Sequence, residues 1–232
     1  MKYKAVIFDL DDTLFNRHGA QIKTSELIAE KLPHLFQHHP LETVTEAFLE
    51  SDEMATIEFN AGVPSDGLRD KRSRNFLRLL GIDENYADKI TEMYVKDYPT
   101  MNIPVAGAVP LIKAITKRVP VGLVSNGYPD VQYTKIEAIG LAKVFSCIIL
   151  SEEFGIRKPD KRIFHQATRL LNVQPSDCLY VGDSYSHDIV GAKGAGMDAC
   201  WINPSSLEPE KKNVQADFVI TNLTKLNEIL GL

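Results

Sequence analysis

The sequence predicts an α/β fold, in which a doubly wound parallel sheet carries an inserted all-helical domain. Three observations predict it. From about residue 105 onward, short apolar runs alternate with helical segments. A separate apolar run stands near the N-terminus, at residues 5–8. The long segment between them has helical periodicity and no convincing strand.

The sheet is expected to contain six strands, with helices between them. Residues 5–8 (AVIF) form the first strand, because four consecutive apolar residues suit a parallel strand that is covered on both faces. Pro159 and Asp160 mark the start of an amphipathic helix. The further strands are expected at residues 119–124, 145–150, 178–181, 199–202 and 218–220, and the helices at residues 131–139, 161–171 and about 189–195.

The inserted segment contains helix-period patterns, such as the spacing of Ile22, Ile28 and Leu32. Pro99 and Gly107 mark the return of the chain to the sheet. We therefore expect a core of residues 1–15 and 100–232 and a helical cap of residues 16–99. A cap inserted in this way could open and close on hinges near its two ends.

Composition narrows the class of protein. The chain has 232 residues, 44% of them hydrophobic and 25% charged, as in ordinary globular proteins. Its net charge of −5 argues against a broad surface for a nucleic-acid polymer. We expect a cytoplasmic protein without signal peptide or membrane span, monomeric or homodimeric. Three scattered cysteines are expected to be buried free thiols: Cys147, Cys178 and Cys200.

A dense acidic run follows the first strand. Asp9, Asp11 and Asp12 place three carboxylates within four residues. These groups repel one another and need compensation if they are buried. Hard oxygen ligands of this kind favour Mg²⁺. The alternative is a helix N-terminus whose first turn the carboxylates cap.

Other polar residues follow the later strands. Ser125 and Asn126 end the second strand, Lys158 lies beyond the third, and Asp183 ends the fourth, with Asp188 five residues later. The carboxyl ends of parallel strands meet at one edge of a sheet, where ligands bind. We therefore expect carboxylates, a hydroxyl and a lysine to gather at this edge.

These ordered residues resemble the haloacid dehalogenase-type hydrolase superfamily. The likeness covers the Asp9-Leu10-Asp11-Asp12-Thr13 run, Ser125, Lys158 with Pro159, and Gly182-Asp183 with Asp188. The inserted helices are similar to the superfamily's N-terminal cap type, over a Rossmann-like core. The core segments are closest in look to the house-cleaning 5′-nucleotidase branch.

The resemblance implies a role for each residue. Asp9 would be the nucleophile that forms an aspartyl-phosphate, and Asp11 would be the general acid and base. Mg²⁺ would be held by Asp9, the backbone carbonyl of Asp11, Asp183 and Asp188, the last directly or through water. Substrate phosphate would be bound by Ser125, Lys158 and the backbone near Asn126.

The resemblance therefore implies a Mg²⁺-dependent phosphatase acting on a small phosphorylated metabolite. A nucleoside 5′-monophosphate is the first choice of substrate. Sugar phosphates, phosphoglycolate and flavin mononucleotide are alternatives. Asp11 argues against a dehalogenase, because a halide leaving group needs no proton. A phosphomutase and a non-enzymatic phosphate-binding module remain open.

Some residues suggest a site but have simpler interpretations. Tyr94 and Tyr98 could stack on a nucleobase, although core packing explains such aromatics more often. His187 could border the metal, although an exposed loop is the simpler expectation. The basic residues of the insertion, Arg72 among them, are expected on a solvated helix face.

Overall fold

The structure is a computed structural model that describes residues 2–63, 67–208 and 214–232. Contacts within the chain divide it into two compact units. One unit comprises Met1–Asn16 and Asn102–Leu232, and the other is Arg17–Met101. That the inserted unit acts as a cap stays a prediction. Within the described ranges, no helix is long and apolar enough to cross a membrane.

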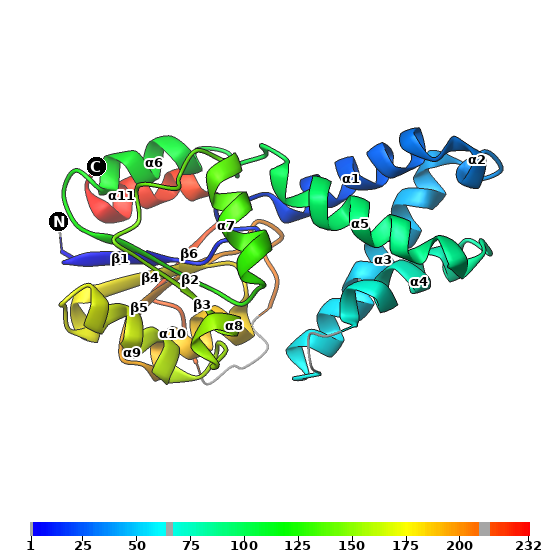
Figure 1. The fold of residues 1–232 in the computed structure, drawn as a ribbon. Helices are drawn as coiled ribbons and strands as arrows, with labels where there is room; N and C mark the ends of the chain where they lie inside the picture. The colour runs from blue at the N-terminus through cyan, green and yellow to red at the C-terminus, as the bar shows by residue number, and fades with distance from the viewer. Residues whose placement is uncertain (1, 64–66, 209–213) are drawn as a thin grey trace. The chain divides into compact units, whose positions relative to one another are not determined.

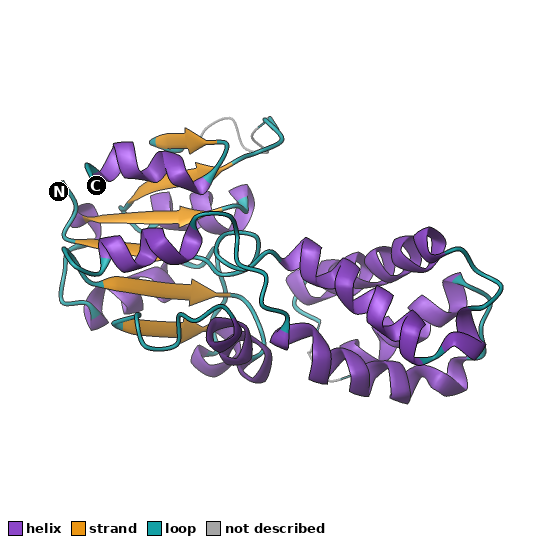
Figure 2. Cartoon of the chain, turned by 90° about the horizontal axis from the view of Figure 1, so that it is seen from above, coloured by secondary structure: helices purple, strands orange, loops and turns teal. Residues whose placement is uncertain are grey.

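The first unit is built on a six-stranded sheet in which all strands run parallel (Figure 2). The strand order is β3-β2-β1-β4-β5-β6, so the sheet is doubly wound about β1 and β4. The predicted α/β class is confirmed. The strands are β1 Ala5–Phe8, β2 Val121–Ser125, β3 Cys147–Leu150, β4 Cys178–Gly182, β5 Asp198–Ile202 and β6 Phe218–Ile220.

Helices cover both faces of the sheet. Figure 1 shows α6 and α11 on one face and α9 and α10 on the other. A continuous apolar core fills the second face, where Phe164 of α9 packs edge-on against Tyr180 of β4 at 5.0 Å between ring centroids. The helices of this unit are α6 Ala108–Ile115, α7 Pro129–Ala138, α8 Ser151–Phe154, α9 Lys161–Leu170, α10 Val190–Gly194 and α11 Leu226–Leu230.

The register of the sheet places the first acidic residue beside the fourth strand. β1 is central and fully buried, as its continuous apolar run predicts. Its last residue, Phe8, lies opposite Val181 of β4. The next residue, Asp9, donates its backbone N–H to the Val181 carbonyl at 2.9 Å. Asp9 therefore emerges next to Gly182 and Asp183.

The bounds of several elements differ from the expectation, as in the third strand, which was expected at residues 145–150 and begins at Cys147. The strand expected at residues 119–124 begins at Val121 instead, since Pro120 cannot donate to the sheet. The helix expected from about residue 189 is preceded by one turn of π-helix, Tyr185–Ile189. This turn, which includes Asp188, is of a kind that occurs frequently at functional sites.

The three cysteines are buried free thiols, as expected. Cys147 and Cys178 lie on β3 and β4, and Cys200 on β5. Burial raises the pKa of Cys147 to about 11 and those of Cys178 and Cys200 to about 12. The thiols are therefore protonated and unreactive at neutral pH.

The second unit is helical and has an aromatic core. Phe48 and Phe76 meet edge to face at 5.4 Å, and Tyr94 stacks on Tyr98 at 4.6 Å. Both tyrosines are buried, so the interpretation as packing residues is confirmed. Its helices are α1 Arg17–Lys31, α2 Pro33–Phe36, α3 Leu41–Asn60, α4 Leu68–Leu79 and α5 Ala87–Asp97, with single 3₁₀ turns at Glu84–Tyr86 and Tyr98–Thr100.

The expectation of a solvated face was wrong for Arg72. This residue is only 4% exposed, and its guanidinium carbon lies 3.1 Å from the centroid of the Tyr94 ring. The planar guanidinium can stack on an aromatic face, which helps to bury an arginine within a core. Helical periodicity alone gave no sign of this contact.

The two chain segments that join the units pair with each other within the first unit. Asn16 donates its backbone N–H to Ile103, and Val105 donates to Leu14, each at 2.9 Å. An antiparallel bridge also joins Phe15 to Pro104. The chain therefore leaves and re-enters the sheet unit at one place, directly after the acidic run.

Candidate active site

The acidic run forms a tight turn at the end of β1. The Leu10 carbonyl accepts hydrogen bonds from Thr13, Leu14 and Phe15 at 3.3, 2.8 and 2.9 Å. The next helix, α1, begins only at Arg17. The alternative of a helix N-terminus capped by these carboxylates is therefore excluded. The turn instead presents its side chains at the carboxyl edge of the sheet.

Three carboxylates converge at this edge. Oxygen atoms of Asp9, Asp183 and Asp188 all lie within 4.8 Å of one another. Asp9 follows β1, Asp183 follows β4, and Asp188 lies on the π-turn. Gly182 makes room for this arrangement, because a Cβ atom there would lie 2.3 Å from Asp188 Oδ2. The predicted gathering of these three residues is what the structure displays.

Lys158 supplies the cation within this cluster. Its Nζ donates to Asp9 Oδ1 and to Asp188 Oδ1, each at 2.6 Å. Tyr180, from within β4, places its hydroxyl 3.1 Å from Asp188 Oδ1 and 3.2 Å from the ammonium. Lys158 is only 4% exposed. A buried ammonium in this position orients both carboxylates and offsets part of their charge.

Asn126 holds the backbone of Lys158 in place. Its side-chain amide donates to the Lys158 carbonyl at 3.1 Å and accepts the Lys158 N–H at 2.9 Å. This reciprocal pair joins the end of β2 to the loop between α8 and α9. The Asn126 side chain is thus a structural partner of Lys158, and the predicted phosphate binding is a role for its backbone.

The charges of the cluster are incompletely balanced. Three carboxylates surround one ammonium, which would leave a net charge of −2 if all were ionised. Burial raises the pKa of Asp9 to about 7, helped by Asp188 and opposed by Lys158. Burial, with the charges of Asp9 and Asp188, also raises the pKa of Asp183 well above its ordinary value. Burial alone would lower the pKa of Lys158, but Asp188 and Asp9 raise it above the usual range.

The residues present fit a divalent cation. A charge of +2 would balance the cluster, and all the donors are hard carboxylate oxygens, which suit Mg²⁺. Burial and the neighbouring carboxylates raise the pKa values of Asp9 and Asp183, and a bound cation would lower them. Asp9 and Asp183 would hold the ion from the ends of two adjacent strands.

The metal-free protein is expected to lose stability as the pH rises from about 4 to about 7. Asp9 has a pKa of about 7 in the folded protein and 3.8 as a model acid, so the folded state binds more protons between these values. Stability therefore falls with rising pH in this window. Mg²⁺ should reverse the trend by replacing the proton. Thermal unfolding at several pH values, in chelator and in Mg²⁺, measures how stability depends on pH in each condition. The same pH dependence in both would contradict the expectation.

A second network surrounds Asp11. Lys135 Nζ donates to Asp11 Oδ1 at 2.6 Å, and Gln132 Nε2 donates to Asp11 Oδ2 at 2.8 Å. The same Gln132 nitrogen lies 2.7 Å from the Ser125 hydroxyl. The Gln132 side chain therefore connects Asp11, the predicted acid and base, to the hydroxyl of Ser125, which is predicted to bind phosphate.

Sequence reasoning missed Gln132, Lys135 and Tyr180. Gln132 and Lys135 are three residues apart on α7, the helix that follows Ser125, so they share the face nearest the strand end. Their spacing after the strand-terminal residues was the available signal. Nothing in the sequence marked Tyr180 as a site residue, because aromatic residues are common within buried strands.

His187 lies on the π-turn and is half-buried, so the expectation of an exposed loop was wrong. Its Nδ1 lies 3.0 Å from the Ser184 hydroxyl. Trp201 is buried in β5, and its indole N–H donates to the Asp183 carbonyl at 2.8 Å. This bond fixes the backbone that carries the Asp183 carboxylate.

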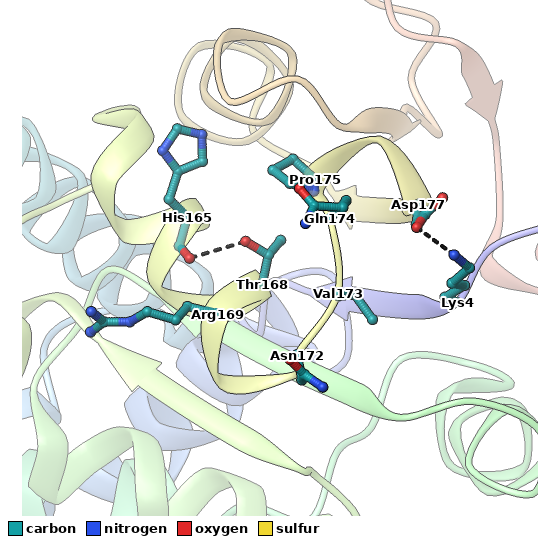
Figure 3. Close-up of a pocket in the computed structure, with 9 residues that line it drawn as sticks. All are labelled: Lys4, His165, Thr168, Arg169, Asn172, Val173, Gln174, Pro175 and Asp177. Carbon is teal, nitrogen blue, oxygen red and sulfur yellow. Dashed lines mark hydrogen bonds and ion pairs between the residues drawn. The ribbon is translucent and has the colours of Figure 1, made fainter.

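A cavity of about 570 Å³ lies elsewhere in the same unit (Figure 3). Its lining comes from the residues before β1 and β4 and from the end of α9, including Lys4, Arg169 and Asp177. These positions are at the amino ends of the strands, away from the carboxylates. Lys4 and Asp177 also neutralise each other at 2.8 Å. None of the predicted site residues lines this cavity.

The family model of haloacid dehalogenase-like hydrolases matches residues 3–196. The chain is also similar to two curated proteins over almost its full length. One is the pyrimidine 5′-nucleotidase YjjG of Escherichia coli, 26% identical over 99% of both chains. The other is the glyceraldehyde 3-phosphate phosphatase of Methanothermobacter thermautotrophicus, 30% identical over 98% of this chain and 99% of its own.

Solved structures agree with this placement. The putative hydrolase YfnB of Bacillus subtilis, solved with bound magnesium, has a TM-score of 0.84 at 25% identity over the whole of both chains. Solved dehalogenases share the fold as well. The fold and the carboxylate site define a hydrolase built on a parallel sheet. The chain belongs to the haloacid dehalogenase-like hydrolase family.

Proposed function

We propose that the protein is a cytoplasmic Mg²⁺-dependent phosphatase that hydrolyses small phosphate monoesters through an aspartyl-phosphate. The observation that carries the proposal is the contact of Lys158 with Asp9 within the cluster of Asp183 and Asp188. This arrangement offers a buried carboxylate nucleophile, a cation beside it and ligands for a metal.

The ion would be held by Asp9, Asp183 and the Asp11 carbonyl. Both oxygens of Asp188 already accept hydrogen bonds, Oδ1 from Lys158 and Oδ2 from the Ser184 N–H at 3.0 Å. This favours an indirect contact, in which Asp188 would reach the ion through a water molecule. When bound, Mg²⁺ would neutralise phosphate charge and orient the nucleophile.

The chain's own residues would divide the reaction into two steps. In the first, an Asp9 oxygen bonds to phosphorus while the bond to the leaving oxygen breaks, and Asp11 gives that oxygen a proton. In the second, Asp11 takes a proton from water, which attacks phosphorus and releases phosphate from Asp9. Lys158 and Ser125 would bind the phosphoryl oxygens throughout.

Asp11 favours phosphate esters over haloacids. An alkoxide leaving group needs a proton, whereas a halide does not. Asp11 is fixed by Lys135 and Gln132 and lies in a network with Ser125, as expected for a group with a defined role. A nucleoside 5′-monophosphate is our first choice of substrate, in keeping with the likeness to the nucleotidase YjjG. The likeness to a glyceraldehyde 3-phosphate phosphatase keeps sugar phosphates as the alternative.

Phosphate release from a panel of esters tests this function. The panel holds nucleoside monophosphates, sugar phosphates, phosphoglycolate and flavin mononucleotide, each with Mg²⁺ and with chelator. We expect release with Mg²⁺ only, and the order of rates names the substrate class. Metal-independent release, or none from any ester by folded protein, would contradict the proposal. Binding of these esters without release would favour a phosphate-binding module.

A further inference from the structure

Helix α7 carries two polar side chains that are almost wholly buried. Gln132 is 1% exposed and Lys135 is 3% exposed. A lysine is seldom buried so completely unless it is paired, because the desolvation of its ammonium is costly. Each of them donates to a different oxygen of the Asp11 carboxylate.

The surrounding chain is adapted to this contact. A Cβ atom at Gly127 would lie 2.6 Å from the Gln132 side-chain nitrogen, so a larger residue there would displace the amide from its present position. Gln132 uses its nitrogen twice, toward Asp11 and toward Ser125. Two donors on separate oxygens fix the rotation of a carboxylate, which one donor cannot do.

We propose that Gln132 and Lys135 are positioning residues for the reaction. They hold the Asp11 carboxylate in one orientation, and Gln132 ties that orientation to the Ser125 hydroxyl. Helix α7 thus fixes the position of Asp11 relative to the Ser125 hydroxyl. This inference rests on the proposed phosphatase function, in which Asp11 acts on the leaving group and then on water.

The test uses two esters with different needs for Asp11. An alkyl phosphate requires a proton on its leaving oxygen, whereas p-nitrophenolate leaves without one. Hydrolysis of the aspartyl-phosphate requires Asp11 with either ester. In Lys135→Met, the second step should therefore limit the p-nitrophenyl reaction, whereas both steps are slowed for the alkyl ester.

We expect kcat for the alkyl ester to fall about 10²-fold in Lys135→Met, the size of effect that follows a small misplacement. With p-nitrophenyl phosphate, kcat and KM should fall together, and a burst of p-nitrophenol near one equivalent per enzyme should precede the steady state. Lys135→Arg, which keeps a charged donor, should recover most of the activity. Glu137→Gln, an exposed charge removal on the same helix, should behave as wild type. If Lys135→Met does not fold, Gln132→Leu carries the same test.

The kinetics of the variants separate a positioning role from a structural one. Equal falls in kcat for both esters, at unchanged KM and without a burst, would mean a structural role and overturn the inference alone. Wild-type rates in both Lys135→Met and Gln132→Leu would overturn it as well. Absence of phosphate release by the wild-type protein would instead refute the proposed function, and the inference with it.

Discussion

Asp9→Asn is expected to abolish turnover and to leave the protein folded. Asparagine has the size and shape of the carboxylate but cannot attack phosphorus, so the loss should be at least about 10⁴-fold. The substitution also removes one of three carboxylates around Lys158. Near pH 8, where Asp9 is ionised in the metal-free protein, the variant should therefore be at least as stable as wild type in chelator.

Phosphate release with the best ester of the panel, and thermal unfolding in chelator and Mg²⁺, measure both effects. The stabilisation by Mg²⁺ should be smaller in the variant, because one ligand has lost its charge. Asp12→Asn is the matched control: it makes the same change three residues away, at a position with a φ of 53° that asparagine tolerates. Residual turnover of Asp9→Asn equal to that of this control would refute the role of Asp9 as the nucleophile.

Lys158→Met is expected to have the opposite effect on stability. Without its ammonium, Asp9 and Asp188 lose the cation that contacts both of them at 2.6 Å. Removal of one partner from a buried ion pair costs about 3–5 kcal/mol. Turnover should be lost too, because the ammonium is proposed to bind the transferring phosphoryl group. Mg²⁺ or a lower pH should restore part of the stability, since each reduces the repulsion among the remaining carboxylates.

Denaturant unfolding of Lys158→Met in chelator, and again with Mg²⁺, gives the comparison directly. Lys161→Met serves as the control, because Lys161 begins α9 only three residues later and is exposed. We expect that variant to match wild type in both stability and turnover. Equal stability of Lys158→Met and wild type in chelator would show that the ammonium does not balance the cluster.

The strand ends were predictable because each stands out within a short stretch of sequence. An apolar run that stops abruptly at an aspartate or a serine identifies both the buried strand and the polar edge. The rule that parallel strands end at one edge then brings Asp9, Ser125 and Asp183 together without knowledge of the strand order. This local pattern, with the family resemblance, was enough for the carboxylate cluster.

The second network could not be predicted in the same way. A lysine on a helix is solvated in most proteins, and the residues around Lys135 in the sequence do not show which acidic group it contacts. Its partner, Asp11, is 124 positions away along the chain. Arg72 was misjudged for a related reason, since its stacking partner Tyr94 lies on another helix. Tertiary contacts decide the burial of such long polar side chains.

The paired segments at Asn16–Ile103 and Leu14–Val105 bear on how this chain could diversify. The chain leaves the sheet unit and re-enters it at neighbouring points. The inserted unit could therefore be replaced without interrupting a strand of the sheet. Substitutions, insertions or wholesale replacement within residues 17–101 leave intact the pairing of β1 with β2 and β4. Evolution, or an engineer, could thus change the inserted unit while keeping the sheet and the carboxylates at its edge.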